Sequence, residues 1–209
     1  MKITIFGATG MVGKVLTDAA LEAGHEVTAL VRSPDKLGPL AKRIRVIDGE
    51  YFSTEAQGEA LSDAEAVMTT VGPRMKRGPN QGEYAKGMQA LVNAMEAASV
   101  RRIVAIGGAG LKLGEEKLSF RRAVMRQILT AIAGASYKDK EREHNLLAAS
   151  ELDWTIVRPP QIAPAKGALT PTLDQAAGMK VDTRQLAGFM LACLDDPSTI
   201  RTAPFVATI

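Results

Sequence analysis

Short apolar segments alternate with longer amphipathic segments along most of this chain. The short segments are rich in β-branched residues, as buried strands are, and the longer ones repeat apolar residues at helical spacing. Strands are predicted at residues 2–6, 25–32, 44–47, 64–72, 102–106, 152–158 and 204–207, and helices at residues 12–23, 54–61, 83–98, 137–150 and from residue 182 onward. This alternation predicts an α/β fold, a doubly wound parallel sheet in a single domain that covers residues 1–209.

Two segments depart from the alternation, and we expect them to form a small region on the substrate side of the domain. Residues 163–179 have no regular pattern and are predicted as a long irregular loop. Residues 110–136 carry an apolar helical stripe of Val124, Met125, Ile128, Leu129 and Ile132, with Arg121, Arg122 and Arg126 away from it. This pattern predicts a packed helix with a basic face in solvent, and a lid over an acidic substrate is the alternative.

A glycine-rich turn follows the first strand, in the string Gly-Ala-Thr-Gly-Met-Val-Gly that ends at Gly13. Gly7 permits a tight turn, Gly10 allows backbone to approach a ligand closely, and Gly13 allows the helix to pack on the strand. The N–H groups at the start of that helix carry partial positive charge, which suits a pyrophosphate. We therefore expect a dinucleotide site in which the contacts from this turn are Gly7, Thr9, Gly10, Met11, Val12 and Gly13.

The end of the second strand bears on the choice of cofactor. An acid at this position favours NAD, whereas an arginine accommodates the 2′-phosphate of NADP. The strand ends at Arg32 and Ser33, and no acid follows until Asp35. A guanidinium grips phosphate well and a serine hydroxyl can add a contact, so NADP(H) is the expected cofactor. The alternative is that Arg32 is only a solvated strand end.

The glycine string resembles that of the atypical short-chain dehydrogenase/reductases. More narrowly, it resembles the NAD(P)H-binding group that includes NmrA-like proteins and the flavin and biliverdin reductases. The string Leu-Asp-Trp-Thr-Ile-Val-Arg-Pro at residues 152–159 is similar to the sixth strand of that family, so the resemblance spans nearly the whole chain. It implies a Rossmann-type fold whose strand order reverses between the first and fourth strands, with the cofactor at that switch point.

The resemblance also implies further cofactor contacts. An acid at the bend after the third strand reaches the adenine in relatives, and either Asp48 or Glu50 could fill that place. The rest of the cofactor should contact residues at and after the ends of the fourth, fifth and sixth strands. These residues are Thr70, Val71, Gly72, Gly107, Gly108, Pro159, Gln161 and Ile162. Gln161 replaces a histidine of the flavin and biliverdin reductases, so their substrate preference does not carry over.

The proton-donating site of standard short-chain reductases is absent. These enzymes use a Tyr-x-x-x-Lys pair and a serine on the fifth strand. The residues four positions after the three tyrosines are Glu55, Met88 and Glu141. Gly107 and Gly108 stand where the serine would be. No catalytic residue is therefore assigned.

Lys140 lies near the register of the family's helix lysine. It could contact the nicotinamide ribose, or it could be one charge in the run Lys-Asp-Lys-Glu-Arg-Glu at residues 138–143. The sequence favours neither alternative.

Two functions fit these features. The first is an NADPH-dependent oxidoreductase that transfers hydride to a planar small-molecule acceptor, such as a flavin or quinone, which draws its proton from water. The second is a non-catalytic NADP(H)-binding regulator of the NmrA-like kind. Positioning alone can lower a hydride-transfer barrier by several kcal/mol, so the missing tyrosine does not exclude the first.

Composition excludes several other classes. The chain has 209 residues, of which 46% are hydrophobic. Its net charge is +3 and it has few aromatic residues, so both its positive charge and its aromatic content are too low for a nucleic-acid-binding surface. A lone Cys193 and two histidines predict neither a disulfide nor a metal site. No segment is long and apolar enough for a membrane span, and we expect a cytoplasmic monomer or small homo-oligomer.

Overall fold

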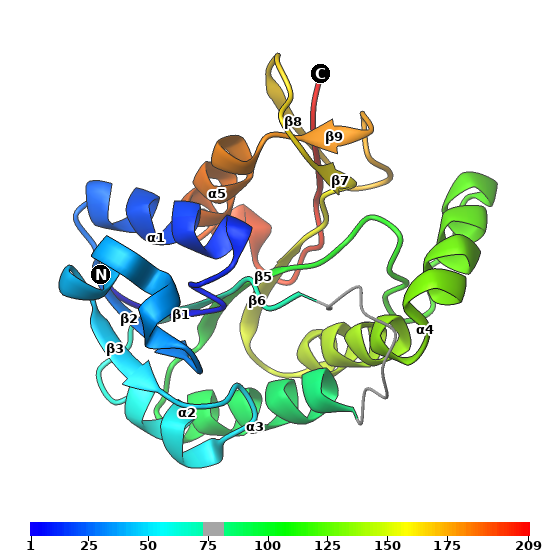
Figure 1. Ribbon diagram of the computed structural model, residues 1–209. Helices are drawn as coiled ribbons and strands as arrows, with labels where there is room; N and C mark the ends of the chain where they lie inside the picture. Colours follow the sequence, from blue (N-terminus) through cyan, green and yellow to red (C-terminus); the bar gives the residue numbers. More distant parts are fainter. Residues whose placement is uncertain (73–81) are drawn as a thin grey trace.

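Six parallel strands form the main sheet of the computed structural model, which describes residues 1–72 and 82–209 (Figure 1). The strands are β1 (Lys2–Phe6), β2 (Glu26–Val31), β3 (Arg45–Asp48), β4 (Ala66–Thr69), β5 (Arg102–Ile106) and β6 (Asp153–Val157). Their order in the sheet is β3-β2-β1-β4-β5-β6. The order reverses between β1 and β4, so the doubly wound fold is confirmed.

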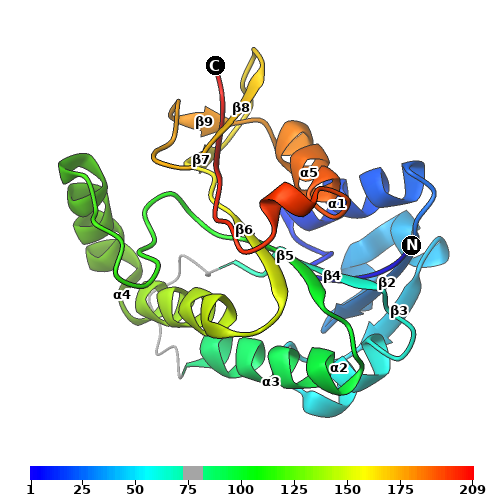
Figure 2. The same cartoon turned by 180° about the vertical axis from the view of Figure 1, so that it is seen from behind.

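Helices cover both faces of this sheet (Figures 1 and 2). On one side lie α1 (Met11–Glu22) and α5 (Thr183–Ala192), and on the other lie α2 (Thr54–Ala60), α3 (Glu83–Ala97) and α4 (Phe120–Ala149). Side chains alternate between the faces, so Ile3 and Ile5 join the core beneath α1 while Phe6 joins the core beneath α3. Burial on both faces explains why these strands are almost continuously apolar.

Helix α4 consists of two helical segments, as predicted, but the faces of its first segment differ from the prediction. The two segments meet at a kink at Gly134, whose backbone is not helical. Val124, Met125 and Ile128 are 40%, 41% and 49% exposed, so the expectation of a packed apolar stripe is wrong for them. The expected basic solvent face is also wrong, because Arg122 and Arg126 turn toward the body of the protein and pair with carboxylates there.

The side chains of three residues in that predicted pattern, Arg121, Leu129 and Ile132, lie outside the described part of the structure.

Residues 163–179 are not wholly irregular, which corrects a second prediction. They contain β8 (Leu169–Thr172), which pairs antiparallel with β10 (Phe205–Thr208). A further short pair joins β7 (Gln161–Ile162) to β9 (Lys180–Val181). The partner of β8 lies far along the chain, so local pattern could not reveal it. The short helices η1 (Pro34–Lys42) and η2 (Pro197–Thr199) complete the described elements.

Helix α5 begins where predicted. Asp182 caps it by accepting hydrogen bonds from the N–H groups of Arg184 and Gln185 at 2.9 and 3.4 Å. Across residues 1–72 and 82–209, none of the helices combines the length and apolar character that crossing a membrane requires.

Candidate functional site

The glycine-rich turn packs tightly between β1, α1 and the end of β4. Gly7 has a φ of +84°, and a Cβ there would lie 2.8 Å from Thr70 Oγ1 and 2.9 Å from Val71 N. A Cβ on Gly13 would lie 2.1 Å from the carbonyl oxygen of Gly7. Glycine is required at both positions, because side chains would push α1 away from the sheet. The turn therefore holds the first N–H groups of α1 close to the strand ends.

A cavity opens beside this turn, at the carboxyl ends of β1, β2, β3 and β4. Its wall is formed by Gly7, Thr9, Gly10, Leu30, Val31, Arg32, Gly49, Glu50, Tyr51, Phe52, Thr70, Val71, Gly72, Glu83 and Tyr84. This is the switch point of the sheet, where open α/β folds bind ligands. The structure thus brings together eight of the residues predicted to contact cofactor, from four separate segments of the chain.

The other residues of the turn contribute differently. Met11 is 62% exposed at the start of α1, whereas the side chain of Val12 is buried in the core. Val12 and Gly13 can therefore offer a ligand only their backbone N–H groups. Gly10 precedes the helix without a capping side chain, so those N–H groups remain for a bound anion.

Arg32 reaches the cavity wall from the end of β2. Its side chain is exposed, and it forms no ion pair with any residue in the described parts of the chain. Ser33 follows as the residue before η1, and its hydroxyl makes no capping hydrogen bond. An exposed guanidinium without an ion pair among the described residues, next to a serine hydroxyl, fits a phosphate group.

The two candidate adenine contacts separate in the structure. Glu50 lies on the cavity wall, whereas Asp48, the last residue of β3, lies outside it and is exposed. Gly49 N donates a hydrogen bond to the carbonyl of Val31 at 3.0 Å, which ties the segment just before Glu50 to the end of β2.

The residues predicted for the nicotinamide side lie at the same edge of the sheet but outside this cavity wall. Gly107 and Gly108 follow β5, and Pro159, Gln161 and Ile162 follow β6. The two segments are joined, because Gly107 N donates to the carbonyl of Val157 at 2.7 Å and Ala109 N to that of Pro159 at 2.9 Å. The structure thus forms two groups of predicted residues, one around the turn and one beside β5 and β6.

Lys140 is buried, so the alternative of a solvated charge is wrong for it. Its side chain is 2% exposed, and Nζ donates to the carbonyl of Val71 at 2.5 Å. Val71 belongs to the cavity wall, so the ammonium lies directly behind that wall.

Sequence reasoning missed the aromatic part of the wall, which consists of Tyr51, Phe52 and Tyr84. The tyrosines entered only as members of a possible Tyr-x-x-x-Lys pair. Tyr51 and Phe52 directly follow the bend at Gly49, which is a signal that could have found them. Burial raises the pKa of Tyr84, so its phenol stays protonated at neutral pH.

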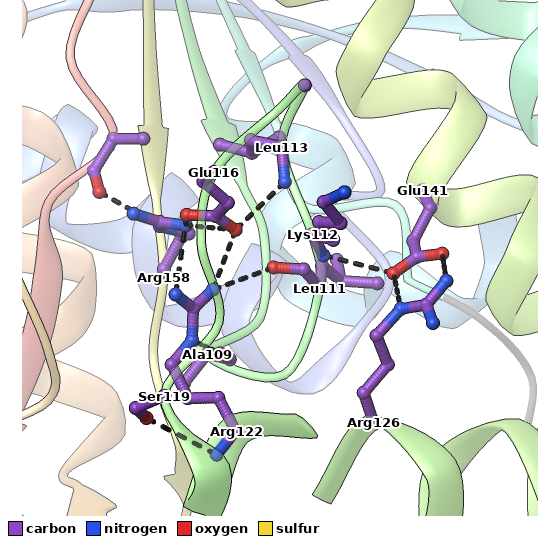
Figure 3. A network of polar contacts seen from close by, with 12 residues as sticks. Ala109, Leu111, Lys112, Leu113, Glu116, Ser119, Arg122, Arg126, Glu141 and Arg158 are labelled. Atoms are coloured by element: carbon purple, nitrogen blue, oxygen red, sulfur yellow. Dashed lines mark hydrogen bonds and ion pairs between the residues drawn. The ribbon is translucent and has the colours of Figure 1, made fainter. Parts of the chain in front are cut away.

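The segment between β5 and α4 is held by two groups of ionic contacts (Figure 3). Glu116 accepts hydrogen bonds from Arg122 at 2.7 Å and from Arg158 at 2.9 Å. Although burial acts in the opposite direction, these arginines keep the pKa of Glu116 below its usual value. Arg126 binds both carboxylate oxygens of Glu141 at 2.7 Å. The start of α4 is thereby fixed to β6 and to its own second half.

Comparisons with known proteins agree with this geometry. A model of the NAD(P)H-binding family matches residues 7–197. YwnB of Bacillus subtilis (strain 168) is 26% identical over 160 residues, which are 76% of this chain and 71% of YwnB. Eugenol synthase 1 of Petunia hybrida is 22% identical over 98% of this chain and 68% of its own length.

Solved structures show the same fold. ChuY of Escherichia coli O157:H7, described as an anaerobilin reductase, superposes with a TM-score of 0.81 at 19% identity, over 100% of this chain and 97% of ChuY. A short-chain dehydrogenase/reductase of Veillonella parvula in complex with NADP gives 0.78 at 21% identity, over 99% and 94% of the two chains. With the family match over most of its length and the glycine turn at the switch point, this chain belongs to the NAD(P)H-binding family of Rossmann-fold proteins.

Proposed function

We propose that this chain is an NADPH-dependent oxidoreductase that transfers hydride to a planar acceptor, such as a flavin or quinone, without a Tyr-x-x-x-Lys site. The observation that carries the proposal is the exposed, unpaired Arg32 on the cavity wall at the end of β2, in the part of the chain that the structure describes. An NAD-preferring site would place an acid there. The family match to NAD(P)H-binding proteins supports the cofactor class.

Most of the predicted residues have a role in this proposal. The backbone N–H groups of Met11, Val12 and Gly13 hold the pyrophosphate, which Gly10 allows to approach closely, and Arg32 and Ser33 hold the 2′-phosphate. Glu50 accepts from the adenine amino group, and Thr70 to Gly72 support the middle of the cofactor. Lys140 orients the nicotinamide ribose beside the glycines after β5 and the loop from Pro159 to Ile162. Bound there, the reduced nicotinamide supplies hydride.

The proposed class of hydride acceptor follows from the absence of a proton-donating Tyr-x-x-x-Lys pair in the sequence. Gly107 and Gly108 offer no hydroxyl to a substrate carbonyl, and none of the three tyrosines has a lysine four positions later. A flavin or quinone takes up hydride into a conjugated ring and can draw its proton from water, so positioning is the main task of the protein. Segments 110–136 and 163–179 would form the substrate side of the site. The reductase names among similar proteins support oxidoreductase chemistry without naming this acceptor.

The test has two parts. Purified protein with NADPH and a panel of flavins and quinones should show loss of absorbance at the reduced nicotinamide band. Replacing Arg32→Ala should weaken NADPH affinity about ten- to a hundredfold, by removing a charge-assisted contact of roughly 1.5 to 3 kcal/mol, and leave NADH affinity nearly unchanged.

The matched control is Arg43→Ala, because Arg43 is also an exposed arginine but pairs with Asp18 away from the cavity. Equal losses of NADPH and NADH affinity in the Arg32 variant would contradict the proposed role of Arg32.

A second candidate is a non-catalytic NADP(H)-binding regulator. The observation that favours it is the exposed apolar face on the first half of α4, formed by Phe120, Val124, Met125 and Ile128, which offers a surface for another protein. Tight NADPH binding with no reduction of any acceptor in the panel would favour this candidate over the first.

A further inference from the structure

Lys140 and Glu143 form an ion pair in the interior of the protein. Their side chains are 2% and 0% exposed, and Nζ of Lys140 lies 2.5 Å from Oε2 of Glu143. The same ammonium donates to the carbonyl of Val71 on the cavity wall. Burying two charges is costly unless each is paired and hydrogen-bonded, so a pair in this place needs an explanation beyond stability.

Tyr51 adds a third group to this pair. Its hydroxyl donates to Oε1 of Glu143 at 3.2 Å, while its ring forms part of the cavity wall. The ring packs against α3 at Gly87, where a Cβ would come within 2.4 Å of two ring atoms. Gln57 Nε2 donates to the backbone carbonyls of Tyr51 and Gly87 at 2.5 and 3.1 Å, which fixes the segment. A glycine inside a helix destabilises it by about 1 kcal/mol relative to alanine, and here the missing side chain leaves the space that the Tyr51 ring occupies.

Burial sets the proton positions in this cluster. It raises the pKa of the Tyr51 phenol well above its usual value, so the hydroxyl stays protonated and donates. It also raises the pKa of Glu143, while Lys140 and Tyr51 act in the opposite direction by donating to the carboxylate. The carboxylate therefore depends on both donors for its charge.

Other charged groups near Lys140 are engaged elsewhere. Asp139 accepts from the backbone N–H of Tyr84 at 2.8 Å, at the start of α3. Glu141 is bound to Arg126, and both ring nitrogens of His144 face backbone carbonyls. From α3, the ring of Tyr84 lies 5.7 Å from Nζ. Within the described residues, Glu143 is the carboxylate in contact with this ammonium.

We infer that Glu143 is a positioning residue, which pairs with the buried ammonium of Lys140 and directs it at the wall of the cofactor cavity, with Tyr51 holding the carboxylate in place. This inference rests on the proposed function, in which Lys140 orients the nicotinamide ribose. Glu143 itself does not touch the cofactor. Its effect passes through Lys140, because its nearest contacts to the cavity are that ammonium and the Tyr51 hydroxyl.

The test is the pH dependence of NADPH affinity, measured by fluorescence titration between pH 7 and 9, where a phosphate monoester is almost fully ionised. In the wild type, Lys140 keeps its ion pair with Glu143, and we expect a nearly constant affinity. In Glu143→Gln the buried ammonium loses its counter-ion, and burial favours the neutral amine. We expect affinity to fall about tenfold as pH rises through this range, because a neutral amine attracts the anionic cofactor less.

A matched control is Glu96→Gln, which removes the same charge from an exposed position on α3 and should behave as the wild type does. A double variant, Lys140→Met with Glu143→Gln, should show no pH step. It should also recover most of the roughly 10 °C loss in Tm that we expect for Glu143→Gln alone, since breaking a buried pair costs more than replacing both partners.

If Glu143→Gln does not fold, Lys140→Met is compared with the double variant. Their NADPH affinities should agree within about twofold, because Glu143 acts through Lys140. A tenfold difference between them would overturn the inference, as would identical pH profiles for the wild type and Glu143→Gln. Failure of the wild type to bind NADPH would instead overturn the proposed function, and the role of Glu143 with it.

Discussion

The two halves of α4, which meet at Gly134, bury opposite kinds of side chain. The second half places Leu147 in the core beneath the sheet at 0% exposure and carries the buried Lys140 and Glu143. The first half leaves Val124 and Ile128 exposed and turns Arg122 and Arg126 inward. Figures 1 and 2 show this first half projecting away from the sheet. An apolar helical stripe therefore does not by itself tell which face of a helix meets the protein.

The difference follows from what each half has as a neighbour. The second half packs along α3, whose Met88, Leu91 and Met95 are fully buried and offer an apolar surface. The first half meets the segment between β5 and α4, which offers the carboxylate of Glu116 and backbone carbonyls (Figure 3). Guanidinium groups satisfy those acceptors and methyl groups cannot. Arg122 and Arg126 therefore turn inward.

The largest expected effect is the difference between the two halves of α4 in how much a buried or exposed side chain contributes to the free energy of unfolding. Leu147→Ala should lower the free energy of unfolding by about 3 kcal/mol, because it leaves a cavity in the core. Ile128→Ala, at a residue that is 49% exposed, should change it by less than about 1 kcal/mol. Urea denaturation of both variants measures the difference. A loss of similar size for Ile128→Ala would mean that the first half is covered in solution.

A smaller effect concerns acid stability and the second half. Burial lowers the pKa of His144 from 6.5 to about 3, so the folded protein keeps this ring neutral while the unfolded chain becomes protonated below pH 6.5. The ring costs no stability above pH 6.5, and the cost grows as pH falls from 6.5 toward 3. Between pH 6.5 and pH 4.5 the loss should be about 2 to 3 kcal/mol.

Urea denaturation across this pH range, on the wild type and on His144→Gln, isolates the contribution of the ring. The variant should be less stable than the wild type at pH 7 but should lose stability less steeply toward acid. Parallel pH profiles for the two proteins would show that His144 is protonated in the folded state.

The smallest effect concerns the junction of the two halves. Gly134 has a φ of 53° and a ψ of −122°, a conformation that residues with a side chain rarely adopt, and a Cβ there would meet nothing within 4 Å. Gly134→Ala should therefore cost about 1 to 2 kcal/mol through backbone strain alone. Amide hydrogen exchange should then rise in residues 120–133, which depend on the kink for their ionic contacts.

Gly58→Ala is the matched control. Gly58 lies inside α2 with open space around its Cα and an ordinary helical φ, so alanine should stabilise the protein slightly, by about 0.5 to 1 kcal/mol. A Gly134→Ala variant as stable as the wild type would show that α4 can straighten without cost.

Much of the fold could be predicted because its signals are local. The alternation from Lys2 to Phe6 and the glycines that follow specify a strand, a tight turn and a helix within a few residues, and the structure has all three. The antiparallel pairing of β8 with β10 could not be predicted in this way, since its partners lie far apart in sequence.

The candidate site likewise contains residues that local sequence could predict and residues whose positions depend on distant parts of the chain. The turn residues and Arg32 were predicted from their types and their positions directly after the first strand and at the end of the second, and Gly7, Thr9, Gly10 and Arg32 lie on the cavity wall. Tyr51 was missed as part of the wall because its position depends on Gly87 and on Glu143, which is 92 residues away. The sequence left two alternatives open for Lys140, because a run of charged residues has the same pattern whether one of its side chains is buried or all of them lie in solvent.

The sequence by itself determined the class of the fold, the dinucleotide turn at Gly7 to Gly13 and the absence of a Tyr-x-x-x-Lys site. Only the tertiary structure decided that Lys140 is buried and that Glu50 and not Asp48 faces the cavity. It also decided that the first half of α4 turns Arg122 and Arg126 inward. The physical reason is that periodicity and turn geometry arise from neighbours along the chain. Burial and charge pairing depend instead on the acceptors and apolar surfaces that distant segments supply.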